Sequence, residues 1–330
     1  MLIYRYKLKF QGSTHFGDTG IDLENVSECI NSDTLFSALV NAVSTLEGGK
    51  AATDFVNRFI NQPPILISSL FLYTGDIFFL PRPMIDNHIP KELKRTMGKE
   101  LKGLKWLTVE EFKKWTCESA LTEPDICSMQ DDQEKYKKAF EVEMRPRVSL
   151  DRTTQQSKIY HAGYVYFHQN AGLYGLAAFN DLSTLDYFKR LLSGLGDIGL
   201  GGEKTYGCGM FKVVEFQEVT GIFKDILEGN SRQITLLSLY HPSTAEEASL
   251  DDKLIAYDVI RKKGWINSGR HALPLKRKSI GFITEGSVFK EYVKGRVADV
   301  TPETDPYSML THNVYRYGYA FTVPLGGSYE

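Results

Sequence analysis

The sequence predicts an α+β fold whose first two-thirds forms a ferredoxin-like split βαβ unit interrupted by a large insertion. Between residues 2 and 217, strand and helix patterns follow in the order strand, helix, strands, helix, strand. From Pro81 to about residue 160, prolines, a basic helix and an acidic stretch follow without regular strands. The last third shows short strands that indicate a second α+β domain. We therefore expect domains at 1–217 and 218–330, with the insertion at about 81–160.

The first elements follow from apolar periodicity and from capping residues. Residues 2–10 alternate apolar and basic side chains, which is typical of a half-buried strand. A helix is expected to begin at Ser32-Asp33-Thr34, because an apolar stripe at helical spacing follows and runs to Gly48-Gly49. Residues 51–61 predict another short helix.

The remaining elements are predicted in the same way. Strands are expected at 65–73 and 76–80, and a hairpin is expected from strands at 164–169 and 173–179. A helix over 182–195 and a strand over 210–216 complete the first domain. Further strands are expected in the second domain near residues 233–240, 254–260, 277–284 and 314–323.

Composition is that of an ordinary folded protein. The chain has 330 residues, of which 42% are hydrophobic and 24% charged. No apolar run is long enough for a membrane span, and residues 1–10 do not resemble a signal peptide, so we expect a cytoplasmic protein. The four cysteines form no CxxC pair, which favours reduced thiols over a structural zinc. We expect no metal site and no cofactor.

The net charge of −2 conceals separated basic patches. Basic residues recur along 91–105, over 145–158 and over 261–278, whereas acidic segments such as 246–252 offset them. Such runs are common on solvated faces. They also suit a subunit that contacts RNA on one side and proteins on others.

The segment from Gly199 to Phe211 is the most informative part of the chain. Five glycines fall within eleven positions, and Lys204 and Tyr206 lie between them. Glycines permit positive φ and close backbone approach, and exposed N–H groups in such loops bind anions. A lysine adds charge, and a tyrosine offers a face for base stacking. The loop therefore predicts a polyanion held along its backbone, with a flexible connection as the alternative.

The elements around this loop exclude two familiar phosphate sites. The order here is helix, loop, strand, whereas dinucleotide and Walker sites need strand, loop, helix. Neither G-x-G-x-x-G nor G-K-[ST] occurs in the loop. We therefore do not expect the phosphate to be that of NAD or ATP.

Five stretches together resemble one known family. They are Asn31–Leu39, Arg147–Thr153, the glycine loop, Lys276–Phe289 and His312–Ala320. Through nearly its whole length, apart from the insertion at 81–145, the sequence resembles subunit four of the Csm complex. That family is the Cas5-like RAMP subunit of type III-A CRISPR effectors.

The resemblance implies two ferredoxin-like, RRM-related domains and a thumb, formed by the insertion, near the duplex of guide and target RNA. It implies a non-catalytic RNA-binding subunit that caps the 5′ end of the CRISPR RNA (crRNA) and holds its repeat-derived tag. It also implies docking to the Cas-ten large subunit and to the Csm-three backbone subunit. One alternative is a Cas6-like metal-independent endoribonuclease that processes precursor crRNA. Another is a two-domain RNA-binding protein unrelated to CRISPR.

Apart from His15, the candidate RNA-binding residues fall into four groups. The glycine loop supplies Gly199, Gly201, Gly202, Lys204, Thr205 and Tyr206. Ser32 and Thr34 open the first helix, whose N-terminal N–H groups favour an anion, although an ordinary helix cap is the alternative for Ser32.

The other two groups lie farther along the chain. Arg147 and Arg152 suit phosphate, and the nearby side chains of Lys158, Tyr160 and His161 suit a single strand of RNA; a solvated strand edge is the alternative. Arg270 and Lys276 belong to the same class, with a protein interface as the alternative.

His15 is the residue that most favours an enzymatic interpretation. A histidine can act as general base when a 2′-OH attacks the adjacent phosphate. A single loop histidine is more often a hydrogen-bonding residue or a neighbour of a stacked base. We therefore place His15 among the RNA-binding residues and expect no catalytic residue.

Overall fold

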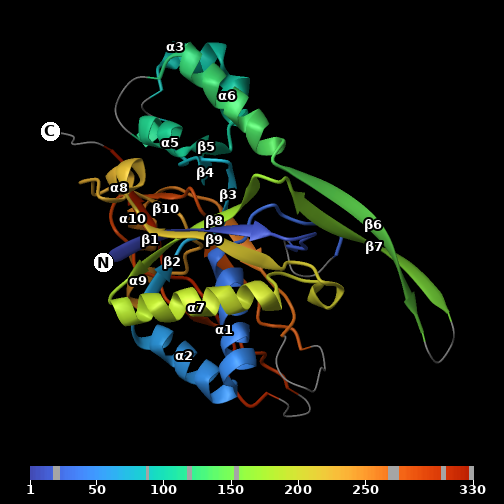
Figure 1. Ribbon diagram of the computed structural model, residues 1–330. Coiled ribbons are helices and arrows are strands. Elements are labelled where there is room, and N and C mark those ends of the chain that lie inside the picture. Colours follow the sequence, from blue (N-terminus) through green and yellow to red (C-terminus); the bar gives the residue numbers. More distant parts are fainter. Residues whose placement is uncertain are drawn as a thin grey trace.

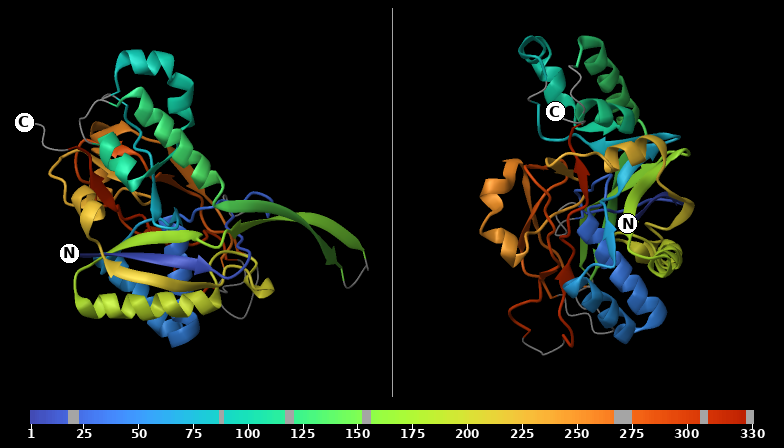
Figure 2. Two further views of the ribbon diagram at one scale, coloured as in Figure 1. Left: turned by 45° about the horizontal axis from the view of Figure 1, so that its top comes forward. Right: turned by 90° about the vertical axis from the view of Figure 1, so that its left-hand side faces the viewer.

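The computed structural model describes residues 1–17, 23–86, 89–116, 121–151, 156–266, 275–305 and 310–326. A central antiparallel sheet separates a layer of helices from the insertion, and the last third of the chain packs against its side (Figures 1 and 2). Among the described helices, none combines the length and the apolar character that crossing a membrane requires.

The central sheet is built around its first strand. β1 (Leu2–Phe10) pairs on one side with β8 (Ala171–Phe179) and on the other with β9 (Phe211–Glu218), antiparallel in both cases. β8 also pairs with β2 (Ile65–Ile67) and with β3 (Phe71–Thr74). β4 (Ile77–Pro81) and β5 (Trp106–Thr108) extend the sheet beyond β3.

Three helices cover one face of this sheet (Figure 1). They are α1 (Ser32–Glu47), α2 (Gly49–Asn61) and α7 (Leu182–Ile198). Successive side chains of a strand point to opposite faces of the sheet. On the face toward these helices, Tyr6 and Leu8 of β1 are fully buried in the core. The opposite face of the sheet packs against the insertion in a second core.

The insertion has two parts. Its compact part comprises α3 (Lys91–Thr96), α4 (Gly98–Gly103), β5, α5 (Val109–Thr116) and α6 (Glu123–Lys137). Its second part is a long two-stranded ribbon, formed by β6 (Phe140–Leu150) and β7 (Ser157–Phe167), that projects from the body (Figures 1 and 2). The expected basic helix over 91–105 is thus two short helices followed by a strand.

The last third of the chain forms a second antiparallel sheet. After α8 (Gly221–Leu227), β10 (Ile234–Leu236) pairs with β14 (Val288–Phe289) and with β17 (Thr322–Pro324). The other segments of this region are α9 (Thr244–Glu247), α10 (Leu250–Lys253), β11 (Leu254–Ala256), β12 (Val259–Lys262), β13 (Ile280–Ile283), β15 (Ala298–Asp299) and β16 (Tyr315–Arg316). β11 pairs with β14, so the sheet order is β11-β14-β10-β17.

The sequence-based predictions of α+β class and of the main helices are confirmed. The predicted hairpin between 164–169 and 173–179 is wrong, because β7 pairs with β6 and β8 lies between β1 and β3. Every residue of β8 is buried, which is the environment of a central strand. The expectation that the insertion lacks regular strands is also wrong, because β6 alone spans eleven residues.

Candidate nucleic-acid interface

The glycine loop needs its glycines for backbone conformation. Gly199, Gly201, Gly207 and Gly209 have φ between 78° and 98°, a region that favours glycine. Between them, a short 3₁₀ turn runs over Lys204–Tyr206. The Leu200 N–H donates to the Gly209 carbonyl at 2.9 Å and closes the loop on itself.

The loop also packs closely on residues 13–16. The Gly202 N–H donates to the His15 carbonyl at 2.8 Å, and the Gly209 N–H donates to the Ser13 carbonyl at 2.9 Å. A Cβ on Gly201 would lie 2.5 Å from the His15 carbonyl oxygen, so only glycine fits there. The Gly202 N–H is therefore not available for the phosphate that the sequence placed on it. Within the described part of the chain, the N–H groups of Lys204 and Thr205 have no protein acceptor.

His15 lies beneath the loop. Its side chain is buried, and Nδ1 lies 2.8 Å from the Gly163 carbonyl oxygen. A Cβ on Gly202 would come within 2.7 Å of its imidazole ring. His15 therefore supports the loop from below and borders the cavity described next.

A cavity of about 520 Å³ opens where the loop, the start of α1 and the last third of the chain meet. Gly201, Gly202, His15 and Thr34, all predicted from the sequence, line it together. Five basic side chains also line it, namely Lys204, Lys262, Lys263, Arg277 and Arg316. Such a concentration of positive charge favours a polyanion. No cluster of three metal-binding side chains occurs among the residues that the structure describes.

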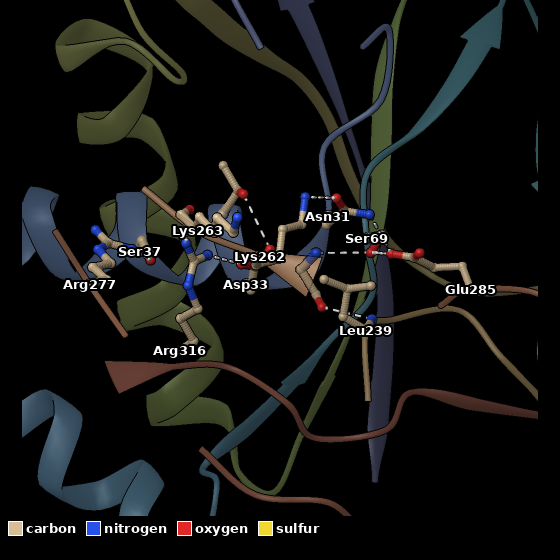
Figure 3. Close-up of polar contacts among 12 residues, drawn as sticks. Asn31, Asp33, Ser37, Ser69, Leu239, Lys262, Lys263, Arg277, Glu285 and Arg316 are labelled. Atoms are coloured by element: carbon tan, nitrogen blue, oxygen red, sulfur yellow. Dashed lines mark hydrogen bonds and ion pairs between the residues drawn. The ribbon is translucent and has the colours of Figure 1, made fainter. Parts of the chain in front are cut away.

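A buried polar network at the start of α1 holds the walls of this cavity together (Figure 3). Arg316 forms an ion pair with Asp33, and its Nη2 donates to the Lys263 carbonyl at 2.7 Å. The Lys262 ammonium donates to Asn31 Oδ1 at 2.6 Å, and Asn31 Nδ2 donates to Glu285 at 3.0 Å. The network therefore joins the first helix to strands near the end of the chain.

The structure separates the two predicted residues of α1. Ser32 is fully buried, and its hydroxyl accepts a hydrogen bond from the Leu239 N–H at 3.1 Å. Its own N–H donates to the Ser69 hydroxyl at 2.9 Å, so Ser32 has a structural role in this network. Asn31, rather than Ser32, occupies the cap position of the helix. Thr34 is only partly buried and faces the cavity.

A second cavity of about 760 Å³ continues from the first. Ser37, Asn41, Lys204 and Arg277 line both. Burial lowers the pKa of Lys204, and it lowers the pKa of Arg277 to about 10, where neighbouring Arg316 adds to the effect. These two cations thus lie at the junction of one continuous groove.

The projecting ribbon meets the glycine loop through an arginine and two tyrosines. Arg147 donates to the Tyr164 hydroxyl from Nε at 3.1 Å and from Nη2 at 2.7 Å. Its guanidinium also lies 4.4 Å from the centre of the exposed Tyr206 ring, a cation–π distance. The hydrogen bond to Tyr164 raises the pKa of Arg147, which stays charged.

The ribbon has two different faces. Arg147 pairs with Tyr160 and Ser149 with Lys158, so Lys158 and Tyr160 share the face of Arg147. His161 pairs with Pro146 and lies on the other face. That face carries exposed apolar side chains, namely Val142, Met144, Val148, Leu150 and Ile159.

The remaining predicted residues lie near the mouth of the groove or outside the described residues. Lys276 lies over the ring of Trp265, with 4.9 Å between its ammonium and the ring centre. Trp265 is 44% exposed and lines the first cavity. Arg152 and Arg270 lie outside the described residues.

Sequence reasoning missed several residues of the groove. Asn31, Trp265, Arg277 and Arg316 line the first cavity, and Asp33 pairs with Arg316 behind them. None of these was predicted as a site residue, although the basic run over 261–278 pointed to part of this wall. Only the fold brings Asp33 beside Arg316, because 283 positions separate them.

Comparison with known proteins decides the family. Residues 7–212 match the model of the RAMP superfamily, and residues 229–325 match the CRISPR Csm4 C-terminal domain. A CRISPR system protein Csm4 from Thermococcus onnurineus is 30% identical over 308 residues, covering 89% of this chain and 90% of the relative. The chain belongs to the Csm4 family. A Csm4 from Methanocaldococcus jannaschii is 24% identical and covers 97% of this chain and 96% of its own.

Solved Csm4 structures share the fold. The chain resembles Csm4 in a crystal structure of a Csm1–Csm4 cassette in complex with pppApA, at 22% identity and a TM-score of 0.63 over the full length of both chains. It also resembles a chain of a Csm3–Csm4 subcomplex of the type III-A CRISPR-Cas interference complex, at 20% identity and a TM-score of 0.61, with 98% and 99% of the two chains covered.

Proposed function

We propose that this Csm4-family chain is a non-catalytic RNA-binding subunit of a type III-A CRISPR effector complex. In this proposal it caps the crRNA 5′ end and holds the repeat-derived tag in the groove between the glycine loop and the last third of the chain. The observation that carries the proposal is the convergence of loop, α1 and five basic side chains on one cavity. RNA binding depends strongly on such positive charge around the phosphates.

We further propose that both domains, 1–217 and 218–330, are ferredoxin-like. In the first, the strands that frame the unit follow the order β9-β1-β8-β3, and α1 and α7 provide the two crossovers. In the second, the order β17-β10-β14-β11 repeats the same 4-1-3-2 pattern with very short strands and helices. The groove then lies between two units of related topology, as expected of RRM-related proteins that bind single strands.

The proposed partners are Csm1 (the Cas-ten large subunit), the Csm3 backbone subunit and target RNA. The support for the protein partners is that solved Csm4 relatives form complexes with Csm1 and with Csm3. The projecting ribbon suits the thumb near the guide–target duplex, because one face offers arginine and tyrosine side chains and the other exposed apolar ones.

The geometry of His15 favours the non-catalytic role over a Cas6-like endoribonuclease. A general base needs to reach the 2′-OH whose proton it removes. The imidazole of His15 is buried, with Nδ1 beside the Gly163 carbonyl and its carbon edge beneath Gly202. This arrangement suits a residue that supports the loop.

Reconstitution tests this proposal. The chain is assembled with the Csm1 and Csm3 proteins of the same source and with a tagged crRNA, and RNA retention is measured. We expect stable retention of the tagged RNA, and reduced retention when the repeat-derived tag is deleted. Assembly that is indifferent to the tag would contradict the proposal. In a separate incubation with precursor crRNA, specific cleavage that is lost in His15→Ala would favour the endoribonuclease.

A further inference from the structure

Two basic side chains at the junction of the groove come from different parts of the chain. Lys204 belongs to the glycine loop, and Arg277 lies just before β13. Both line both cavities, together with Ser37 and Asn41 of α1. The junction is therefore a point that any strand passing along the whole groove has to cross.

Lys204 and Arg277 differ from Arg316 and Lys262 in their protein partners. Arg316 is neutralised by the buried carboxylate of Asp33, and Lys262 binds the Asn31 amide oxygen. Within the described residues, Lys204 and Arg277 form no ion pair with a carboxylate. The Arg277 guanidinium has one long hydrogen bond, 3.5 Å from Nη1 to the Ser37 hydroxyl, and its Nε is buried without an acceptor.

A partly buried cation that forms no direct ion pair is costly, and a ligand that supplies negative charge offsets this cost. Asp33, which pairs with Arg316, attracts Arg277 without forming an ion pair with it. The side chains of Lys204 and Arg277 are both partly buried, so water is partly removed from both groups, and this burial lowers the pKa of each. A guanidinium offers a planar fork of donors and an ammonium a compact point charge, and both bind phosphate oxygens. One anionic group between them satisfies both at once.

We propose that Lys204 and Arg277 bind the same backbone phosphate of the RNA and thereby clamp it between the two domains. This inference rests on the proposed function, because it assumes that RNA occupies the groove. It adds that Arg277, which is not among the candidate residues named from the sequence, is a binding residue, and that one shared phosphodiester links the glycine loop to the C-terminal domain.

The salt dependence of binding distinguishes one shared phosphate from two separate ones. Each phosphate neutralised on single-stranded RNA contributes about 0.7 to the slope of log affinity against log salt. If the phosphate is shared, Lys204→Gln together with Arg277→Gln flattens the slope by about 0.7, and each single change flattens it by less. If the phosphates are separate, the double variant flattens it by about 1.4, twice the value for one phosphate.

The experiment uses the complex reconstituted with Csm1, Csm3 and tagged crRNA. We expect each single Gln variant to weaken RNA binding by on the order of tenfold, the usual effect of losing a charge-assisted hydrogen bond. Arg277→Lys should keep the salt slope but lose part of the affinity, because it keeps the charge and loses the fork. Arg95→Gln is the control, since Arg95 is an exposed side chain on α3 paired with Glu92.

The outcomes separate this inference from the proposed function. A salt slope flattened by about 1.4 in the double variant would overturn the shared phosphate, and so would unchanged affinity in both single variants. In either case, retention of the tagged crRNA by the wild-type complex would still support the proposed function. If the wild-type complex retained crRNA equally well with and without the repeat-derived tag, both the inference and the proposed function would be overturned. If the double variant does not fold, as judged by its melting profile, Arg277→Lys and the two single variants still decide the question.

Discussion

At the residue scale, two glycines of the loop have the same kind of backbone conformation for different reasons. Gly201 has φ 98° and lies against the His15 carbonyl, whereas Gly207 has φ 78° and faces open space. The first position therefore combines backbone strain with a steric limit, and the second has backbone strain alone.

We predict that Gly201→Ala destabilises the fold more than Gly207→Ala. Alanine at Gly207 should cost about 1–2 kcal/mol, the penalty of a left-handed conformation. Alanine at Gly201 carries a similar penalty and also places Cβ 2.5 Å from the His15 carbonyl oxygen. The free energies of unfolding from urea titrations measure this difference, and equal losses would show that the loop does not pack on residue 15 as described.

At the element scale, α5 begins with a reciprocal pair of hydrogen bonds. The Glu111 carboxylate accepts from the Thr108 N–H at 2.8 Å, and the Thr108 hydroxyl accepts from the Glu111 N–H at 3.2 Å. Burial raises the pKa of Glu111 to about 7, and the neighbouring carboxylate of Asp132 adds to this.

This raised pKa predicts a pH dependence of stability. Glu111 favours folding while it is protonated, so its contribution is complete below the pKa of the unfolded chain, about 4.3. It is lost as the pH rises through about 7, because the unfolded chain has already released the proton that the folded chain holds. Glu111→Gln should therefore flatten the fall in unfolding free energy between these pH values. If the unfolding free energies of the wild type and of Glu111→Gln changed with pH in parallel, the prediction would be contradicted.

The ribbon allows a second prediction at this scale. Arg147→Ala should reduce RNA retention more than Arg95→Ala, because Arg147 lies against Tyr206 of the glycine loop and Arg95 lies on an exposed helix of the insertion. Each change removes one guanidinium, so the comparison controls for charge. Retention assays on the assembled complex decide it, and an equal or reversed loss would place the RNA away from the contact between the ribbon and the glycine loop.

At the scale of the whole molecule, a buried ion pair links the first helix to the end of the chain. Asp33 and Arg316 are both buried, so water does not screen them. Asp33→Leu should cost about 3–5 kcal/mol, because it leaves the buried Arg316 without a counter-charge. Adding Arg316→Met should restore part of this loss. A double variant less stable than Asp33→Leu alone, by urea unfolding, would contradict this role.

The sequence predicted local features well because they depend on neighbouring residues. The alternation over residues 2–10 and the apolar stripe of α1 gave both elements correctly, and the glycines marked the loop that lines the groove. It could not show that β7 pairs with β6, since residues 164–167 have strand character whichever partner they take. The opposite wall of the groove could not be predicted either, because only tertiary packing brings Arg277 and Trp265 to the loop.

Photo-crosslinking tests directly whether RNA lies in the groove between the glycine loop and the C-terminal domain. The complex is assembled with crRNA carrying 4-thiouridine in its tag, irradiated, and digested to map the crosslinked peptides. We predict crosslinks at Trp265, an exposed aromatic residue that lines the groove, and at Tyr206, the exposed aromatic residue of the glycine loop. Crosslinks confined to the insertion helices α3–α6 would contradict the placement of RNA in this groove.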